Sequence, residues 1–124
     1  MALSEKTTLL LGASTNPERA SYEAVRSLKV YGIPVIAVGR REYDMGDMKI
    51  IIGKPDISEK IHTVALYLNA GNQVEYYDYI LALKPKRIIF NPGTKNPELS
   101  KLAVKKGIEV VEDCMMVMLS TGSF

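Results

Sequence analysis

The stretch 12–19 has the residue types of an anion-binding turn. Its small and polar members are Gly12, Ala13, Ser14, Thr15 and Asn16. Asn16-Pro17 is a typical helix start, because asparagine caps free N–H groups and proline at the first position lacks one. Backbone N–H groups, two hydroxyls and the positive end of a helix dipole would meet here, which is a common way to hold phosphate without a metal.

This turn is not one of the well-known nucleotide motifs. Ser14 and Pro17 stand where a dinucleotide fold would have its second and third glycines, and no Gly-Lys-Ser/Thr follows as in a Walker loop. A purely structural turn is therefore a real alternative. Arg19 lies in the first predicted helical turn, where it either reaches back to a phosphate or is an ordinary solvated arginine.

A second chemical feature is the arginine pair Arg40-Arg41, which follows the apolar stretch that ends at Val38-Gly39. An NAD-binding fold would have an acid here to accept the ribose hydroxyls. Two cations instead favour an adenosine with an extra phosphate, either the 2′-phosphate of NADP or the 3′-phosphate of coenzyme A. Alternatively, Glu42 pairs with one arginine in a solvated loop.

Catalytic and metal-binding groups are scarce in this sequence. His62 precedes a predicted strand and is expected at the amino end of the sheet, away from the predicted pocket. Cys114 has no histidine placed as its base, so a small buried residue is the favoured interpretation. The adjacent Glu112 and Asp113 would point apart and share no proton. One histidine and one cysteine cannot assemble a metal site.

The elements that must position these residues alternate along the chain. Strands are predicted over residues 7–11, 33–38, 48–52, 63–68, 87–90 and 108–111, with a charged loop over 39–46. Helices are predicted over 17–31, over 73–83 with Asn72 as cap, from an Asn96 cap to Gly107, and over 114–119. This alternation predicts a single α/β domain over 1–124, with a doubly wound, mostly parallel sheet of five to six strands and helices on both faces.

In such a sheet, ligands bind beyond the carboxyl ends of the strands. Four segments would meet there, namely the loop that begins at Gly12 and residues 38–41, 67–71 and 91–94. Composition limits the ligand classes. The chain has 124 residues, with 16 Lys and Arg against 14 Asp and Glu, and has no cationic block that would favour nucleic acid. The single cysteine and the lack of a long apolar run predict a cytoplasmic protein without a membrane segment.

The helix predicted over 73–83 carries more aromatic surface than one sheet-facing stripe requires. Val74, Tyr77 and Leu81 share a face and are expected in the core, whereas Tyr76 and Tyr79 lie largely elsewhere. Tyrosine is favoured at interfaces, so this helix suggests a homodimer. Isolated surface tyrosines are the alternative.

Four stretches resemble the CoA-binding domain family. They are GASTNPERASY at 12–22, TVALYLNAGNQ at 63–73, RIIFNPGTKNPEL at 87–99 and GIEVVEDC at 107–114. The chain is thus similar to small stand-alone members of that family and to the coenzyme A-binding domain of the succinyl-CoA synthetase alpha subunit. The resemblance implies a Rossmann-like fold of the NAD(P)-binding superfamily with coenzyme A bound across the strand ends.

The resemblance also implies which residues contact the ligand. The phosphates would be held by Gly12, Ala13, Ser14, Asn16 and Arg19, and the adenosine end by Val38, Gly39 and Arg40. The adenine and pantetheine would be flanked by Tyr67, Leu68, Asn69, Asn91 and Pro92.

Three functions compete at this point. The first, which we favour, is non-catalytic binding of coenzyme A or an acyl-CoA. The second is a small enzyme, either an NADP oxidoreductase or a thiol-dependent acyl-transfer enzyme, and it lacks a convincing proton donor or nucleophile. The third is a regulatory or interaction protein with a vestigial nucleotide site, in which the tyrosine-bearing helix binds a partner.

Overall fold

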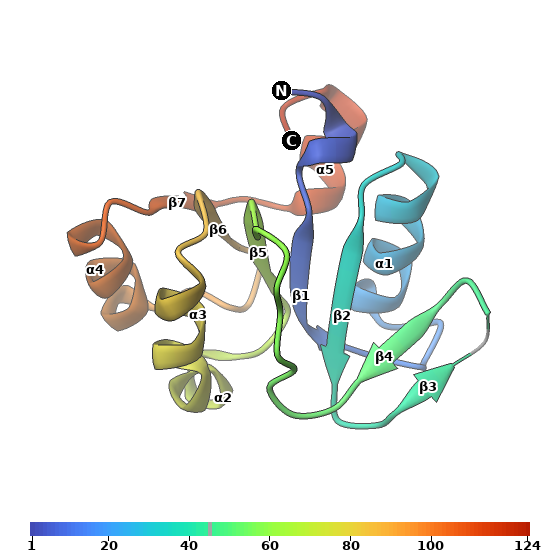
Figure 1. The fold of residues 1–124 in the computed structure, drawn as a ribbon, viewed down its shortest axis with the longest axis horizontal. Coiled ribbons are helices and arrows are strands. Elements are labelled where there is room, and N and C mark those ends of the chain that lie inside the picture. The colour runs from blue at the N-terminus through green and yellow to red at the C-terminus, as the bar shows by residue number, and fades with distance from the viewer. Residues whose placement is uncertain (45) are drawn as a thin grey trace.

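The computed structural model describes residues 1–44 and 46–124, and its seven strands form one sheet (Figure 1). Their bounds are β1 (Thr8–Ala13), β2 (Val35–Gly39), β3 (Tyr43–Asp44), β4 (Lys49–Ile51), β5 (Thr63–Leu66), β6 (Arg87–Phe90) and β7 (Glu109–Glu112). The order is β3-β4-β2-β1-β5-β6-β7, parallel throughout except for the β3–β4 pair. The doubly wound prediction is confirmed.

The strand count is one higher than the six that we predicted. The extra strand is β3, which lies in the stretch 39–46 predicted to be a charged loop and pairs with β4 through Tyr43 and Asp44. A two-residue edge strand carries too little apolar periodicity to be recognised in sequence. Met45, in the same stretch, lies outside the described residues.

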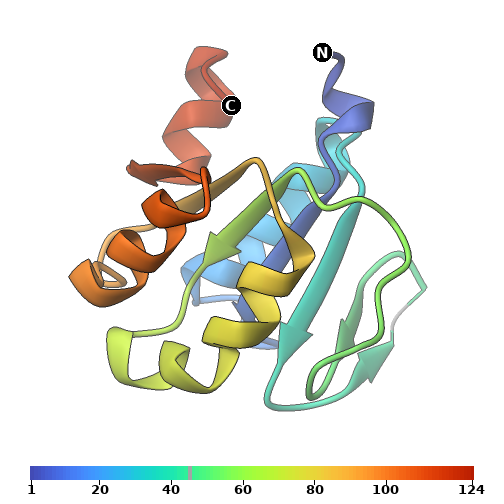
Figure 2. The same ribbon diagram turned by 60° about the vertical axis from the view of Figure 1, so that its left-hand side comes forward.

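Helices cover both faces of the sheet (Figure 2). α1 (Ala20–Val30) and α5 (Met115–Thr121) pack on one face, whose core includes Leu10 and Ala65. α3 (Tyr77–Leu83) and α4 (Pro97–Lys105) pack on the other, whose core includes Leu9 and Leu11. Successive β1 side chains therefore point into two different cores, which explains why the run of leucines does not alternate with polar residues. The remaining helical segments are η1 (Leu3–Glu5), α2 (Ala70–Gln73) and η2 (Val74–Tyr76).

The predicted start of the first helix is wrong. α1 begins at Ala20 rather than Pro17, because Asn16 closes a turn before the helix instead of capping it. The side-chain oxygen of Asn16 accepts from the N–H of Glu18 at 3.0 Å, and its carbonyl accepts from the N–H of Arg19 at 3.0 Å. Arg19 thus occupies the N-cap position with an extended backbone. The Asn16 turn competes locally with helix formation, as short polar side chains often do.

The predicted cap at Asn72 is also wrong. Asn69 caps α2, and its side-chain oxygen accepts from the N–H of Asn72 at 3.0 Å. A 3₁₀ turn then separates α2 from α3, so the apolar positions are rotated relative to one continuous helix. Val74 is consequently exposed, and Ile80 is fully buried in its place. The Asn96 cap of α4 is confirmed, since its side-chain oxygen accepts from the N–H of Leu99 at 3.2 Å.

The tyrosines of this helical segment are used within the chain. The Tyr79 hydroxyl donates to the carbonyl of Pro55, and the Tyr76 ring packs edge-on against Tyr79 at 6.3 Å between centroids. The Lys54 ammonium lies 5.7 Å from the Tyr76 ring. These contacts hold the connection between β4 and β5 against the helix, so the homodimer hypothesis loses the observation that motivated it. In the part of the chain that is described, no helix is long and apolar enough to span a bilayer.

Candidate functional site

Two glycines bring the carboxyl ends of β1, β2 and β5 close together. Gly12 has a φ of +99°, and a Cβ there would lie 2.8 Å from the carbonyl carbon of Tyr67. A Cβ at Gly39 would lie 2.4 Å from the carbonyl oxygen of Ala13. Neither position accommodates a side chain without backbone movement. The strand order reverses between β1 and β5, so this edge is also where a doubly wound sheet binds its ligands.

A polar pocket of about 500 Å³ lies over these strand ends, and we call it the loop pocket. It is lined by Ala13, Ser14, Thr15, Asn16, Arg19, Ser21, Arg40, Arg41, Tyr67, Leu68, Asn69 and Asn72. Hydroxyl, amide and guanidinium groups dominate this lining, which contains no acid. The N-terminus of α1, with Arg19 at its N-cap position, contributes the positive end of a helix dipole. The chemistry of the loop pocket suits an anion.

Part of the predicted donor set is already used by the loop itself. The N–H of Asn16 donates to the Ser14 hydroxyl oxygen at 3.0 Å, and the N–H of Glu18 donates to the Asn16 side chain. These bonds fix the loop in one conformation. The Ser14 hydroxyl proton and the arginines remain among the groups able to meet a ligand.

A narrower pocket of about 300 Å³ adjoins the loop pocket, and we call it the slot. It is lined by Gly12, Val38, Gly39, Arg40, Ile52, Gly53, Leu68, Asn72, Glu75 and Tyr76. Apolar side chains and glycine backbone form most of its walls, whereas Asn72 and Glu75 supply polar atoms. Arg40, Leu68 and Asn72 line both pockets, so the two form one groove with Arg40 at the junction. A slot with both apolar and polar walls beside a cationic pocket matches a planar base next to phosphates.

The structure brings most of the expected contact residues to this groove. Those that line it are Gly12, Ala13, Ser14, Asn16, Arg19, Val38, Gly39, Arg40, Tyr67, Leu68 and Asn69. Asn91 and Pro92 line neither the loop pocket nor the slot. Pro92 is exposed on the following turn.

Asn91 is buried and its amide is occupied inside the fold. Its side-chain nitrogen donates to the carbonyl of Leu66 at 3.1 Å, and its side-chain oxygen accepts from the N–H of Met115 at 2.8 Å. It thereby joins the end of β5 to the first turn of α5. The family resemblance implied a ligand contact at Asn91, and a polar residue at a strand end has the same sequence pattern in either role.

Several lining residues were not among the predicted contacts. They are Thr15, Ser21, Arg41, Ile52, Gly53, Asn72, Glu75 and Tyr76. Ile52-Gly53 follows a parallel strand, so the rule that parallel strands end at one edge was sufficient to include it. The prediction missed Asn72, Glu75 and Tyr76 because it started the helix at the wrong residue. Their orientation depends on the break between α2 and α3.

Tyr67 is the most perturbed titratable group of the loop pocket. Its hydroxyl is buried and has no hydrogen-bond partner among the described residues. Burial, and next the neighbouring Cys114 thiol, raise the pKa of Tyr67 well above its ordinary value. The phenol is therefore neutral at physiological pH and keeps its proton as a potential donor.

The candidate catalytic groups lie at different ends of the sheet. Cys114 follows β7 at the N-cap position of α5 and is half-buried. His62 precedes β5, where its Nδ1 lies 2.8 Å from the Thr63 hydroxyl. The two side chains are thus separated by the length of the strands and cannot form a nucleophile–base pair. Within residues 1–44 and 46–124, no group of three or more acidic, histidine or cysteine residues could hold a metal ion.

Comparison with known proteins decides the family. Residues 6–120 match the family model described as a CoA binding domain. The chain belongs to the CoA-binding domain family. The resemblance stated from the sequence is therefore confirmed, and the site described above is the carboxyl-end groove of a CoA-binding domain.

Solved structures agree with this assignment of fold. The crystal structure of an uncharacterized protein is 48% identical, with a TM-score of 0.90, and the match covers 96% of this chain and 98% of that one. A hypothetical protein from Pyrococcus horikoshii OT3 is 29% identical, with a TM-score of 0.84 over 94% of this chain and 82% of that chain. A structure from Thermus thermophilus, at 23% identity and a TM-score of 0.84, covers 96% and 90% respectively and shares the fold. No curated protein matches the sequence.

Proposed function

We propose that this chain binds coenzyme A or an acyl-CoA in the groove formed by the slot and the loop pocket, and that it catalyses no reaction of its own. The observation that carries the proposal is the position of Arg40. It lines both pockets, where the ribose between a base and a diphosphate would lie. A guanidinium at that point suits a phosphorylated ribose.

Each of the two pockets suits a different part of the ligand. The adenine would enter the slot between Val38, Ile52 and Leu68, with Glu75 able to accept from its amino group. The diphosphate would lie in the loop pocket against Ser14, Arg19 and the N-terminus of α1. Arg40 and Arg41 would hold the 3′-phosphate.

The proposal that the chain catalyses no reaction rests on where its candidate catalytic side chains lie. His62 is at the opposite end of the sheet from the groove, and the Tyr67 phenol holds its proton too tightly to serve as a general base. Cys114 lies at the end of β7, and the one histidine, at the opposite end of the sheet, cannot serve as its base.

Calorimetric titration with coenzyme A, dephospho-coenzyme A, NADP and NAD tests the proposal. We expect coenzyme A to bind most tightly, and removal of its 3′-phosphate to weaken binding by about 10- to 100-fold, since a hydrogen bond to a charged group contributes about 1.5–3 kcal/mol. Arg40→Ala should cause a similar loss. Arg26→Ala is the matched control, because Arg26 lies on α1 outside the groove, near the Tyr22 ring.

Two outcomes contradict this proposal. Tighter binding of NADP than of coenzyme A would assign the arginine pair to a 2′-phosphate and favour an oxidoreductase. No heat with any of the four compounds, from folded protein free of bound nucleotide, would favour an interaction protein with a vestigial site.

A further inference from the structure

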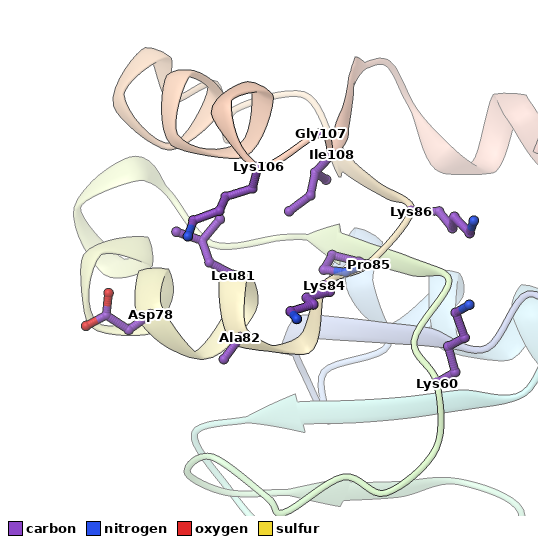
Figure 3. Close-up of a pocket in the computed structure, with 10 residues that line it drawn as sticks. All are labelled: Lys60, Asp78, Leu81, Ala82, Lys84, Pro85, Lys86, Lys106, Gly107 and Ile108. Carbon is purple, nitrogen blue, oxygen red and sulfur yellow. The ribbon is translucent and has the colours of Figure 1, made fainter.

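A second groove lies at the amino end of the sheet, opposite the site described above (Figure 3). This amino-end groove has a volume of about 720 Å³ and is lined by Lys60, Asp78, Leu81, Ala82, Lys84, Pro85, Lys86, Lys106, Gly107 and Ile108. It is larger than the slot or the loop pocket. Four of its lining residues are lysines, and they come from three separate connections of the chain.

The floor of the amino-end groove is apolar and its rim is cationic. Ile108 and Pro85 are buried, and Leu81 is half-buried. Figure 3 shows the ammonium groups of Lys60 and Lys86 together on one side, while those of Lys84 and Lys106 point toward the other. An occupant therefore meets apolar surface in the middle and positive charge along both flanks.

The backbone holds the lysine stems in fixed places. The N–H of Lys86 donates to the carbonyl of His62 at 2.9 Å, and the carbonyl of Lys86 accepts from the N–H of Glu109 at 3.0 Å. Lys106 follows α4, and its N–H donates to the carbonyl of Ala103 at 3.0 Å. These residues are therefore part of the sheet and helix framework and not of a loose loop.

Lys84 has an unusual backbone conformation for a lysine. It ends α3 with φ and ψ of 50° and 54°, and it is the only non-glycine with positive φ among the described residues. The left-handed region is unfavourable for a residue with a Cβ, and glycine usually occupies this position after a helix. The strained backbone of Lys84 places its side chain on the rim of the groove.

The electrostatic field at this end is positive. Burial lowers the pKa of His62, and the nearby cations Arg87, Lys6 and Lys86 lower it further. Glu109 opposes this field by raising the pKa of His62, and Asp78 lies at the end of the groove beyond Leu81.

We propose that the amino-end groove docks an extended, acidic segment of another protein, with apolar side chains between its carboxylates. Four separated ammonium groups match a row of carboxylates better than one small anion, which would engage only one flank. The apolar floor gives the intervening side chains a place to bury. Nucleic acid fits less well, because none of the lining residues is aromatic or an arginine.

This surface is independent of the proposed coenzyme A site. The slot and the loop pocket lie at the carboxyl ends of β1, β2 and β5, whereas the amino-end groove is formed by the segments that lead into β5, β6 and β7. Partner binding and coenzyme A binding can therefore fail or succeed separately.

The test uses a fluorescent peptide made of four glutamate-glutamate-leucine repeats, with a glutamine-glutamine-leucine peptide as the uncharged control. We expect the acidic peptide to bind in about 50 mM salt and to weaken about 10-fold or more in about 300 mM salt. Amide NMR shifts should concentrate at residues 81–86 and 106–108. The double variant Lys84→Glu/Lys106→Glu should weaken binding about 10-fold or more.

Matched variants separate the groove from net charge. The double variant Lys29→Glu/Lys101→Glu changes the net charge by the same amount, but both residues lie outside the groove. Its affinity for the acidic peptide should therefore change less than about 2-fold in about 50 mM salt. Lys84→Gly removes one rim charge without a charge reversal and with a relaxed backbone, so it should weaken binding while leaving the thermal midpoint unchanged or higher. Coenzyme A titration of each variant checks that the distant site is intact.

Three results overturn the proposal. They are no binding of the acidic peptide by the wild-type chain, equal binding of the uncharged peptide, and equal loss in the two double variants. Binding of a single-stranded oligothymidine in preference to the acidic peptide would assign the groove to nucleic acid instead.

Discussion

The two ends of the sheet are both cationic, but they are built differently. At the carboxyl end, backbone packing sets the site: Gly12 and Gly39 allow three strand ends to approach, and a hydrogen-bonded turn leads into α1. At the amino end, a Cβ at Gly107 would meet no atom within 4 Å, and the positive charge sits on exposed lysines. Close backbone packing therefore shapes the first end, whereas flexible lysine side chains on a hydrogen-bonded backbone supply the charge of the second.

The cations themselves differ in the same way. Arg40 and Arg41 carry planar groups able to bind a phosphate with two parallel hydrogen bonds, and Arg40 stands where two pockets join. Lysines are mobile point charges, and those of the amino-end groove surround an apolar floor. A rigid arginine corner suits one defined small molecule, whereas a mobile lysine rim suits a row of acids that varies in detail.

The largest expected effect comes from paired glycine substitutions, one at each end. Gly12→Ala places a methyl group 2.8 Å from the Tyr67 backbone at a φ of +99°, and we expect a loss of about 3 kcal/mol or more in the free energy of unfolding. Gly107→Ala has a φ of +76° but open space, so it should lose only about 1 kcal/mol. Urea unfolding of both variants measures the difference.

Coenzyme A titration extends this comparison. Gly12→Ala should bind coenzyme A weakly even under conditions where it is folded, because relief of the clash moves the loop pocket. Gly107→Ala should bind it normally. Equal losses of stability in the two variants would contradict the claim that backbone packing shapes only the carboxyl end.

Asn91→Ala gives the next largest effect. The substitution leaves the Leu66 carbonyl and the Met115 N–H without their partner inside the fold, so we expect a loss of about 2–4 kcal/mol in the free energy of unfolding. Pro92→Ala, at an exposed neighbouring position, should lose less than about 1 kcal/mol. Unchanged stability together with lost coenzyme A affinity would return Asn91 to the ligand-contacting role implied by the family resemblance.

The sequence predicted the elements better than their ends. Buried strands, the parallel sheet and the Asn96 cap follow from local patterns that tertiary contacts reinforce. The start of α1 does not follow from the local pattern, because the same Asn16 side chain can either cap a helix or close a turn. The break between α2 and α3 has no breaker residue within it, so the wrong cap at Asn72 hid Glu75 and Tyr76 from the predicted site.

The candidate site shows the same limit. Loops that follow parallel strands meet at one edge whatever their details, and this rule brought Gly12, Arg40 and Tyr67 together correctly. The direction of each side chain is decided by packing, which the rule does not include. Asn91 therefore turns inward, whereas Gly12, Arg40 and Tyr67 line the groove. The amino-end groove had no sequence signal, since its four lysines are separated by up to 46 positions between Lys60 and Lys106.

Lys84→Gly sharpens the comparison from the amino end. Glycine adopts the left-handed conformation of this position without the steric cost that lysine bears, so we expect a gain of about 0.5–1 kcal/mol in the free energy of unfolding. Lys106→Gly is the control, because Lys106 has a φ of −93° and glycine there should destabilise the fold slightly. A loss of stability in Lys84→Gly would mean that the lysine stem packs on the groove and that its strained backbone has a structural reason.

The smallest expected effect uses His62 as a reporter of charge at the amino end. It is the only histidine, so its NMR titration is unambiguous. Burial and the cations Arg87, Lys6 and Lys86 hold the pKa of His62 below the unfolded value of about 6.5. Its contribution to stability is therefore complete above that value and is lost as the pH falls through the folded pKa, because the unfolded chain binds the proton more readily. Lys86→Gln should raise the pKa of His62 and reduce that loss of stability at acid pH, measured by urea unfolding between about pH 7 and pH 5.

Saturating coenzyme A should leave the titration of His62 unchanged, since the proposed ligand site lies at the other end of the strands. A shift with coenzyme A as large as the shift caused by Lys86→Gln would show that the two ends are coupled and would break the comparison.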